Sequence, residues 1–199
     1  MDIEYWKNVH KMNFEGSNKM PWEIGTYDIN LEKSLEVINL KSGSVLELGC
    51  GIGEDSIFLS NFGFKVDGID INENFINIAK KKNKNVNFIC GDIYKDIPNK
   101  MYDLIFDRGF LHNIPYKNYY NTFKLINSVL SDEGYFILIT GHPNPNIPNR
   151  MVPNPTPYDK VVLGFKDFFD IKLIREINFK LNKDFKDSLG IIYILKKIK

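Results

Sequence analysis

The segment Glu47-Leu48-Gly49-Cys50-Gly51-Ile52-Gly53 decides the fold class of this chain. It completes a short apolar run that begins at Ser44, and it precedes a helical pattern over Ser56–Phe62 that ends at Gly63. Glycines at alternate positions let the backbone pass close beneath a ligand, and the helix that follows offers free N–H groups in its first turn. The segment therefore predicts a ligand-binding turn between a buried strand and a helix.

Strand and helix patterns alternate outward from this turn, from about residue 44 to residue 140. Further strands are predicted at Phe64–Ile69, Val86–Cys90, Tyr102–Phe106 and Tyr135–Thr140, helices after the N-cap Asn72 and over Tyr119–Leu130, and a turn at Asp132–Gly134. Such alternation predicts a parallel sheet with helices on both faces. Near the end of the chain, Ile171–Phe179 and Ile191–Lys197 suit an antiparallel pair that closes the sheet edge. The predicted class is α/β, with a Rossmann-like, doubly wound and mostly parallel sheet.

Composition limits the domain count and the setting. A length of 199 residues with 43% apolar residues predicts one domain, 1–199, with a packed core. The net charge of +1 argues against a general binder of polyanions or of membranes. Two cysteines and an N-terminus without an apolar leader favour a reduced, cytoplasmic setting. No apolar run is long enough to span a bilayer.

Two flanking segments are candidates for covering the site. We expect residues 1–27 to form an N-terminal cap, although Tyr5, Trp6 and Val9 suit a simple packing face equally well. Six of the nine prolines lie in Gly141–Pro157, which predicts irregular structure after the last parallel strand. Because ligands of open α/β sheets bind at that edge, residues 141–160 are interpreted as a lid, with a plain surface connection as the alternative.

The glycine spacing excludes two nucleotide-binding motifs. A dinucleotide fingerprint G-x-G-x-x-G would need a third glycine where Glu54 or Ser56 stands. Glu54 and Asp55 at the start of the helix would also repel a pyrophosphate. No G-x-x-x-x-G-K-[ST] motif occurs in the sequence. A ligand without phosphate at this turn is therefore favoured.

Two acidic residues follow successive predicted strands in the same register. Asp70 ends the second strand, where a carboxylate can accept hydrogen bonds from two ribose hydroxyls. Asp92 follows the third strand in Cys90-Gly91-Asp92-Ile93. Each aspartate alone is typical of a turn or cap, but the combination with the glycine turn indicates a nucleoside site.

The pattern E-x-G-x-G-x-G resembles the first motif of class I S-adenosylmethionine-dependent methyltransferases. The resemblance implies the strand order 3-2-1-4-5-7-6 and S-adenosylmethionine as cofactor, with its amino-acid and sulfonium end on the glycine turn. Cationic groups of that cofactor make Glu47 and Glu54 acceptable neighbours. Asp92 would bond the adenine amino group, and Ile93 would pack on the ring. The cofactor-binding residues so implied are Trp22, Glu47, Gly49, Cys50, Gly51, Gly53, Asp70, Ile71, Asp92, Ile93, Asp107 and Arg108.

Two further segments resemble a small-molecule subgroup of that family. Asp107–Pro115 is similar to the D-R-G-x-x-H-x-I-P segment of enzymes related to thiopurine and tellurite-resistance methyltransferases, and Met20–Gly25 to their P-W-[DE]-x-G element. The resemblance implies a small-molecule methyl acceptor, with no nucleic-acid or membrane partner. It points to His112 and Asp107 as catalytic residues. The implied acceptor site is formed by Trp22, Phe110, His112, His142 and Arg150.

Several alternatives stay open at this point. His112 is suited to proton transfer by its ordinary pKa, or it shapes the pocket. Arg108 either steers an anionic substrate or pairs with a nearby carboxylate. Trp22 either lies against the sulfonium of the cofactor or belongs to the core. No spacing indicates a metal site. The alternative functions are a non-catalytic cofactor-binding protein, a methyltransferase for protein or RNA, and, more distantly, a nicotinamide oxidoreductase.

Overall fold

The computed structural model describes residues 2–11, 19–143 and 156–198, and seven strands in these residues form one sheet. The strands are β1 (Ser44–Leu48), β2 (Lys65–Asp70), β3 (Asn87–Cys90), β4 (Tyr102–Arg108), β5 (Leu130–Gly141), β6 (Phe169–Phe179) and β7 (Ser188–Lys197). Their order is β3-β2-β1-β4-β5-β7-β6. Strands β1 to β5 pair in parallel, whereas β7 is antiparallel to both β5 and β6. The predicted strand order and the antiparallel C-terminal pair are confirmed.

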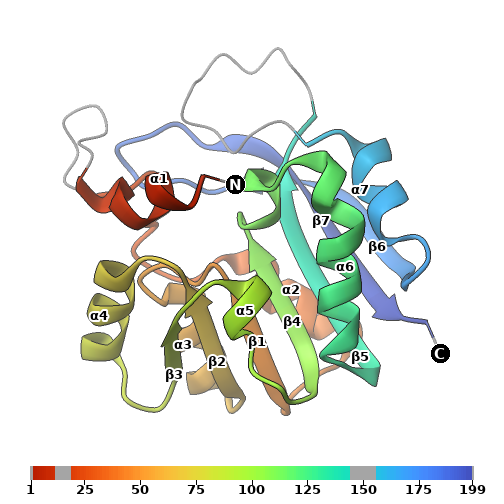
Figure 1. Ribbon diagram of the computed structural model, residues 1–199, viewed down its shortest axis with the longest axis horizontal. Helices are drawn as coiled ribbons and strands as arrows, with labels where there is room; N and C mark the ends of the chain where they lie inside the picture. Colours follow the sequence, from red (N-terminus) through yellow and green to blue (C-terminus); the bar gives the residue numbers. More distant parts are fainter. Residues whose placement is uncertain (1, 12–18, 144–155, 199) are drawn as a thin grey trace.

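Helices cover both faces of the sheet (Figure 1). The helical elements are α1 (Ile3–Asn8), η1 (Val9–Lys11), α2 (Ile29–Ile38), α3 (Glu54–Phe62), α4 (Glu73–Lys82), α5 (Ile93–Asp96), η2 (Leu111–Asn113), η3 (Tyr116–Asn118), α6 (Tyr119–Ser128) and α7 (Tyr158–Phe165). One buried apolar cluster joins the sheet to α2, α3 and α4, and a second joins its other face to α5, α6 and α7. Among the described residues, none of these helices has the length and apolar character needed to cross a membrane.

The pleat of β1 decides which way its acidic residue points. Val45 lies in the cluster beneath α2, α3 and α4, whereas Leu46 and Leu48 lie in the cluster on the other face. Because successive side chains of a strand alternate between faces, Glu47 points to the face that carries α3. The chain moves outward from β1 through β2 to β3 and then returns to β4, so the carboxyl end of β1 is the switch point at which such sheets bind ligands.

Two predicted boundaries are wrong. The turn predicted at Asp132–Gly134 lies within β5, which runs unbroken from Leu130 to Gly141. The pairing with β4 shifts register there, because Tyr102 pairs with Leu130 and Leu104 with Tyr135, so the polar residues form an irregularity inside the strand. The loop expected at 141–160 ends earlier, since α7 begins at Tyr158; residues 144–155 lie outside the described part of the chain.

The N-terminal helix packs over one end of the sheet. Val9 is fully buried against Met20 and Phe75, and the rings of Trp6 and Trp22 lie 5.6 Å apart. The Nδ2 of Asn72, which follows β2, donates to the carbonyl oxygen of Trp6 at 2.8 Å. Figure 1 shows α1 above α4, at the end of the sheet where the parallel strands finish. The packing interpretation of Trp6 and Val9 therefore holds; a cap over a bound ligand stays a prediction.

Candidate cofactor and acceptor site

The turn after β1 is built from glycines in the left-handed region of backbone conformation. Gly49, Gly51 and Gly53 have φ values of 65°, 53° and 79°. The backbone N–H groups of Gly49 and Cys50 both donate to the carbonyl oxygen of Ile69 on β2, at 2.8 and 3.1 Å. A Cβ atom on Gly53 would lie 2.5 Å from the ring of Phe88, so this position also requires a small residue. The alternate glycines thus form the close turn that their spacing predicts.

Asp70 connects the glycine turn to the end of β2. Its carboxylate accepts hydrogen bonds from the backbone N–H groups of Gly51 at 2.9 Å and Asn72 at 2.8 Å. Burial raises the pKa of this carboxyl above its ordinary value, although the backbone N–H donors oppose the shift. The side chain remains partly exposed at the carboxyl edge of the sheet. Each carboxylate oxygen keeps acceptor capacity for a further donor, such as a ribose hydroxyl.

Asp92 occupies the equivalent place after β3. It is the N-cap of α5, where its Oδ1 accepts from the N–H of Tyr94 at 3.0 Å. Ile93, which follows, is buried in the apolar cluster on that face, and Ile71 beside Asp70 is partly buried. The structure therefore gives Asp92 a capping role, which is what a lone strand-end aspartate usually has. Its contact with an adenine stays a prediction.

A small cavity lies between the glycine turn and the Pro-Trp segment. Its lining consists of Trp22, Glu23, Glu47, Gly49, Cys50, Gly51, Ile52, Glu54, Asp55 and Arg108. Four carboxyl groups and one guanidinium therefore face the same space. Such an excess of acidic groups favours a cationic ligand and disfavours a phosphate.

Two of the four carboxyl groups of the cavity, those of Glu47 and Asp55, are buried, whereas Glu23 and Glu54 are partly exposed. Glu47 is only 4% exposed, and its carboxylate accepts a very short hydrogen bond from the hydroxyl of Ser56 on α3. Burial raises the pKa values of Glu47 and Asp55, because it penalises the ionised form. Nearby carboxylates add to both shifts: Asp55 acts on Glu47, and Asp28 and Glu54 act on Asp55. A cation placed in the cavity would lower both pKa values and favour the ionised carboxylates.

Arg108 is engaged by protein groups on every side. Its Nε donates to Oδ2 of Asp28 at 2.8 Å, and its other nitrogens donate to the carbonyl oxygens of Trp22 and Lys180. The guanidinium also lies 4.9 Å from the ring centre of Phe179. Of the two roles open from the sequence, the structure shows the pairing with a carboxylate. Direct binding of the cofactor by Arg108 stays a prediction.

The end of β4 and the turn that follows it hold three further predicted site residues, Asp107, Phe110 and His112. Asp107 is fully buried, and its two oxygens accept from the backbone N–H groups of Phe110 at 2.7 Å and Leu111 at 2.9 Å. Burial raises the pKa of Asp107 to about 7. Burial and the nearby charge of Arg108 lower the pKa of His112 to about 3, so its imidazole is neutral at physiological pH. A Cβ atom on Gly49 would lie 3.1 Å from Cβ of Phe110, which places this turn against the glycine turn.

His142, one of the remaining predicted acceptor residues, does not line the cavity. The Nε2 of His142, at the end of β5, lies 3.1 Å from Oε1 of Glu176 on β6. Arg150 lies outside the described residues. The roles predicted for both residues are therefore untested by the geometry.

Sequence reasoning missed three residues that shape the site. Asp28 pairs with Arg108 and caps α2; Asp55 contributes a buried carboxyl to the cavity; Asn182 contacts the Pro-Trp segment from the connection between β6 and β7. Asp28 precedes an amphipathic helix, so its capping role could have been found. No sequence signal marks Asn182, because its partners lie more than 150 residues away in the chain.

Comparison with known proteins decides the family. A family model described as a methyltransferase domain matches residues 39–182, which is most of the chain and includes the glycine turn, Asp70, Asp92 and β4. The chain belongs to this methyltransferase-domain family.

Curated relatives of this methyltransferase domain share only parts of their length with it. Malonyl-[acyl-carrier protein] O-methyltransferase 2 of Ilyobacter polytropus is 34% identical over 117 residues, which cover 56% of this chain and 42% of the relative. The matched regions amount to between 15% and 64% of the curated relatives.

Solved structures match this methyltransferase domain over more of its length. A protein described under the conversion of a disulfide bond into a thioacetal group during echinomycin biosynthesis gives a TM-score of 0.79 at 19% identity, covering 99% of this chain and 92% of its own. A TehB-like methyltransferase of Corynebacterium glutamicum gives 0.63 at 18%, covering 85% and 93%. The 1,6-didemethyltoxoflavin-N1-methyltransferase of Burkholderia thailandensis, solved with S-adenosylhomocysteine, gives 0.68 at 16%, covering 86% and 78%. At these identities the likeness shows a shared fold.

Proposed function

We propose that this chain transfers a methyl group from S-adenosylmethionine to a small-molecule nucleophile. The observation that carries the proposal is the cavity at the end of β1, where four carboxyl groups and one guanidinium meet a turn of three left-handed glycines. A site with this charge balance fits the cationic methionine end of the cofactor and rejects the pyrophosphate of a dinucleotide.

The chain's own residues would hold the cofactor along the edge of the sheet. Gly49, Gly51 and Gly53 leave room for its amino-acid end, and Asp70 accepts from its ribose. Asp92 and Ile93 lie one strand farther along the sheet, where the adenine would extend. The cofactor would therefore extend across the ends of β1, β2 and β3 in turn, because the glycines, Asp70 and Asp92 follow the carboxyl ends of these neighbouring strands.

When bound, the cofactor supplies an electrophilic methyl group on a sulfonium. The acceptor's lone pair would form the new bond to the methyl carbon, while the carbon–sulfur bond would break and leave its electron pair on sulfur, giving S-adenosylhomocysteine. A thiol or amine acceptor would also release one proton to solvent. The protein contributes mainly by positioning, for which effective molarities of about 10⁵–10⁸ M are known. Trp22 and Phe110 supply apolar surface that removes water from the acceptor.

A neutral His112 suits acceptors that need no strong base. With its pKa lowered to about 3, the imidazole is a weak proton acceptor in the chain without ligands. We therefore assign His112 to the shape and hydrogen bonding of the acceptor pocket rather than to proton abstraction. Thiols, halide or chalcogen anions and amines with a free lone pair are acceptors of this kind.

The experiment that tests the function is direct. The chain is incubated with methyl-labelled S-adenosylmethionine and a mixed panel of thiols, halides, amines and phenols, and products are identified by mass. We expect a labelled product from one class of acceptor, and its loss in Asp70→Ala. Tight binding of cofactor without turnover on any acceptor, or labelling of added protein or RNA instead, would contradict the proposal.

A further inference from the structure

The segment Pro21–Gly25 has no regular secondary structure, yet side chains from distant elements hold its backbone. Glu54, the first residue of α3, accepts from the N–H groups of Ile24 at 3.1 Å and Gly25 at 2.9 Å, one with each oxygen. Arg108 on β4 donates to the carbonyl oxygen of Trp22 at 3.3 Å. Contacts of this kind replace the hydrogen bonds that a helix or strand would supply.

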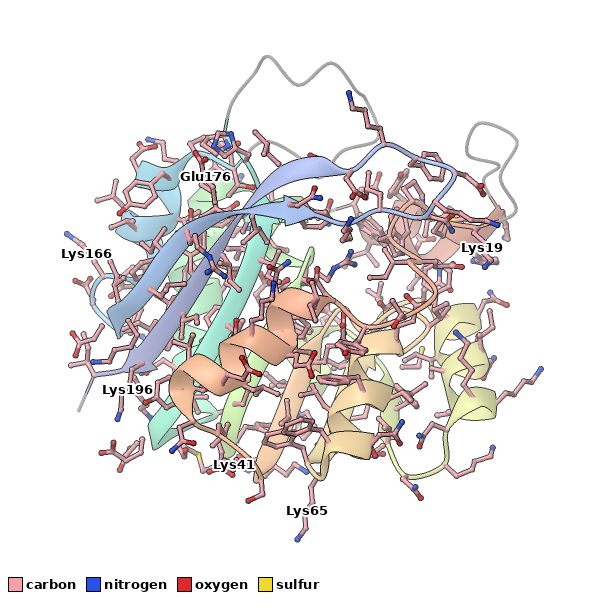
Figure 2. The ribbon with its side chains drawn as sticks, turned by 180° about the vertical axis from the view of Figure 1, so that it is seen from behind. Lys19, Lys41, Lys65, Lys166, Glu176 and Lys196 are labelled. Atoms are coloured by element: carbon pink, nitrogen blue, oxygen red, sulfur yellow. The ribbon has the colours of Figure 1, made fainter. Side chains whose placement is uncertain are left out.

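Asn182 supplies the third attachment of this segment. It lies in the connection between β6 and β7, and it is 3% exposed. Its backbone N–H donates to the carbonyl oxygen of Pro21 at 2.7 Å, and its Nδ2 donates to the carbonyl oxygen of Glu23 at 2.8 Å. Asn182 thus holds the carbonyl groups of the residues before and after Trp22, Pro21 and Glu23. Figure 2 shows the connection extending across the end of the molecule that carries Lys19, which precedes the segment.

We propose that Asn182 is a positioning residue that sets the indole of Trp22 against the cofactor cavity. The proposal rests on the proposed function, because it assigns Trp22 to the wall of that site. Holding the backbone around Trp22 sets the position of its Cα and Cβ atoms, so only the two side-chain torsions are left to place the indole ring. Misplacement by about 1 Å in a methyl-transfer site can cost 10²-fold in rate.

If Asn182 only stabilised its own turn, its replacement would lower stability without moving the indole of Trp22. Asn182 also organises its own turn, since its Oδ1 accepts from the N–H of Asp184 at 3.2 Å and its carbonyl oxygen accepts from Phe185 at 2.8 Å. Asn182→Asp keeps an oxygen for the turn, replaces the donor to Glu23 by a carboxyl oxygen, and adds an acidic group at a buried position. Asn178→Asp is the matched control, because Asn178 lies on the same hairpin, is exposed, and donates to Asp187.

The position of Trp22 can be measured without catalysis. Trp6 and Trp22 are the two tryptophans of the chain, so Trp6→Phe leaves Trp22 as the single reporter of fluorescence. In that background we expect Asn182→Asp to raise the acrylamide quenching constant of Trp22 at least twofold, and Asn178→Asp to leave it unchanged. Equal quenching in both variants would overturn the proposal. If Asn182→Asp does not fold, Asn182→Ala, which lacks the amide donor and carries no charge, takes its place.

A double-mutant cycle tests whether the position of Trp22 affects the binding of S-adenosylhomocysteine. We expect Asn182→Asp to weaken S-adenosylhomocysteine binding about tenfold in the chain with Trp22, as one lost buried hydrogen bond would. In a Trp22→Phe background the same change should cost less than twofold, because the group being positioned is absent. An equal loss in both backgrounds would contradict the proposal. If the unmodified chain binds neither S-adenosylmethionine nor S-adenosylhomocysteine, the proposed function fails, and the quenching experiment decides the role of Asn182 alone.

Discussion

Asp28 and Arg108 form an ion pair that is almost wholly withdrawn from solvent. Their side chains are 0% and 6% exposed, and Nε of Arg108 lies 2.8 Å from Oδ2 of Asp28. The other oxygen of Asp28 accepts from the N–H of Asn30 at the start of α2. One carboxylate therefore caps a helix and neutralises the guanidinium that reaches Trp22 and Lys180. This pair joins the N-terminal third of the chain to β4 beside the cavity.

Breaking this pair should destabilise the fold strongly. We expect Arg108→Met to lower the free energy of unfolding by about 3–5 kcal/mol, because it leaves a buried carboxylate without its partner. Urea unfolding monitored by circular dichroism measures the change. The control is Lys7→Met, which removes an exposed pair with Glu4 and should cost at most about 1 kcal/mol. Similar values for the two variants would show that the buried pair is not structural.

Asp70 should matter more for the cofactor than for folding. We expect Asp70→Ala to weaken S-adenosylmethionine binding at least tenfold in calorimetry, because two acceptor oxygens at the ribose position are lost. Asp67→Ala is the control on the same strand: Asp67 bonds the Tyr102 hydroxyl and pairs with Lys100. This variant should lose stability and keep its affinity within twofold. Unchanged affinity in a folded Asp70→Ala chain would show that the ribose does not bind there.

Substitutions at two glycines distinguish the effect of backbone strain from the effect of blocking the cavity. Gly51 and Gly63 both have positive φ, and a Cβ atom on either would meet no other atom within 4 Å. An alanine at each position should therefore cost about 1–2 kcal/mol of stability through strain alone. Only Gly51 lines the cavity, so Gly51→Ala should also abolish cofactor binding, whereas Gly63→Ala should bind normally. Equal binding by both variants would place the ligand elsewhere.

The buried carboxyl of Asp107 predicts a dependence of stability on pH. In the unfolded chain this group releases its proton near its ordinary value, whereas in the folded chain its pKa is raised to about 7. Between about pH 4 and pH 7 the folded state therefore binds more protons, and this group's contribution to stability falls as pH rises, by at most about 1.4 kcal/mol per pH unit. The free energy of unfolding should decline less steeply over that window in Asp107→Asn. Parallel curves for the two proteins would mean that Asp107 is ionised in the fold.

His112 should not appear in the pH dependence of turnover. Because its pKa is lowered to about 3, the imidazole stays neutral from pH 5 to pH 9. We expect His112→Gln to lower kcat/KM through a changed pocket while the shape of the pH–rate profile stays the same. An inflection near pH 6 to 7 that disappears in the variant would instead identify His112 as a base in the complex.

The local parts of this architecture are predictable from sequence because short-range chemistry determines them. The glycine spacing after β1 gives the three left-handed residues, and Asn72 caps α4 through the N–H groups of Asn74 and Phe75 as its position predicts. Apolar periodicity places the helices and strands. The turn expected at Asp132–Gly134 failed because β4 pairs with Leu130 and Tyr135 on either side of the polar segment. Lys196 and Lys197 of β7 also form ion pairs with Glu133 and Asp132.

The sequence by itself determined the alternation of strands and helices along the chain, the glycine turn and the aspartates at the ends of β2 and β3, because these depend on residue spacing along one stretch of chain. The order of the strands in the sheet was implied by the family resemblance. Only the tertiary structure decided what Arg108, His112 and Asn182 do. Arg108 meets Asp28 across 80 positions, and Asn182 meets Glu23 across 159. The pKa of His112 falls because packing removes water around it. Such contacts, and the loss of water that accompanies them, depend on how remote segments of the chain pack together. No local sequence pattern specifies that packing.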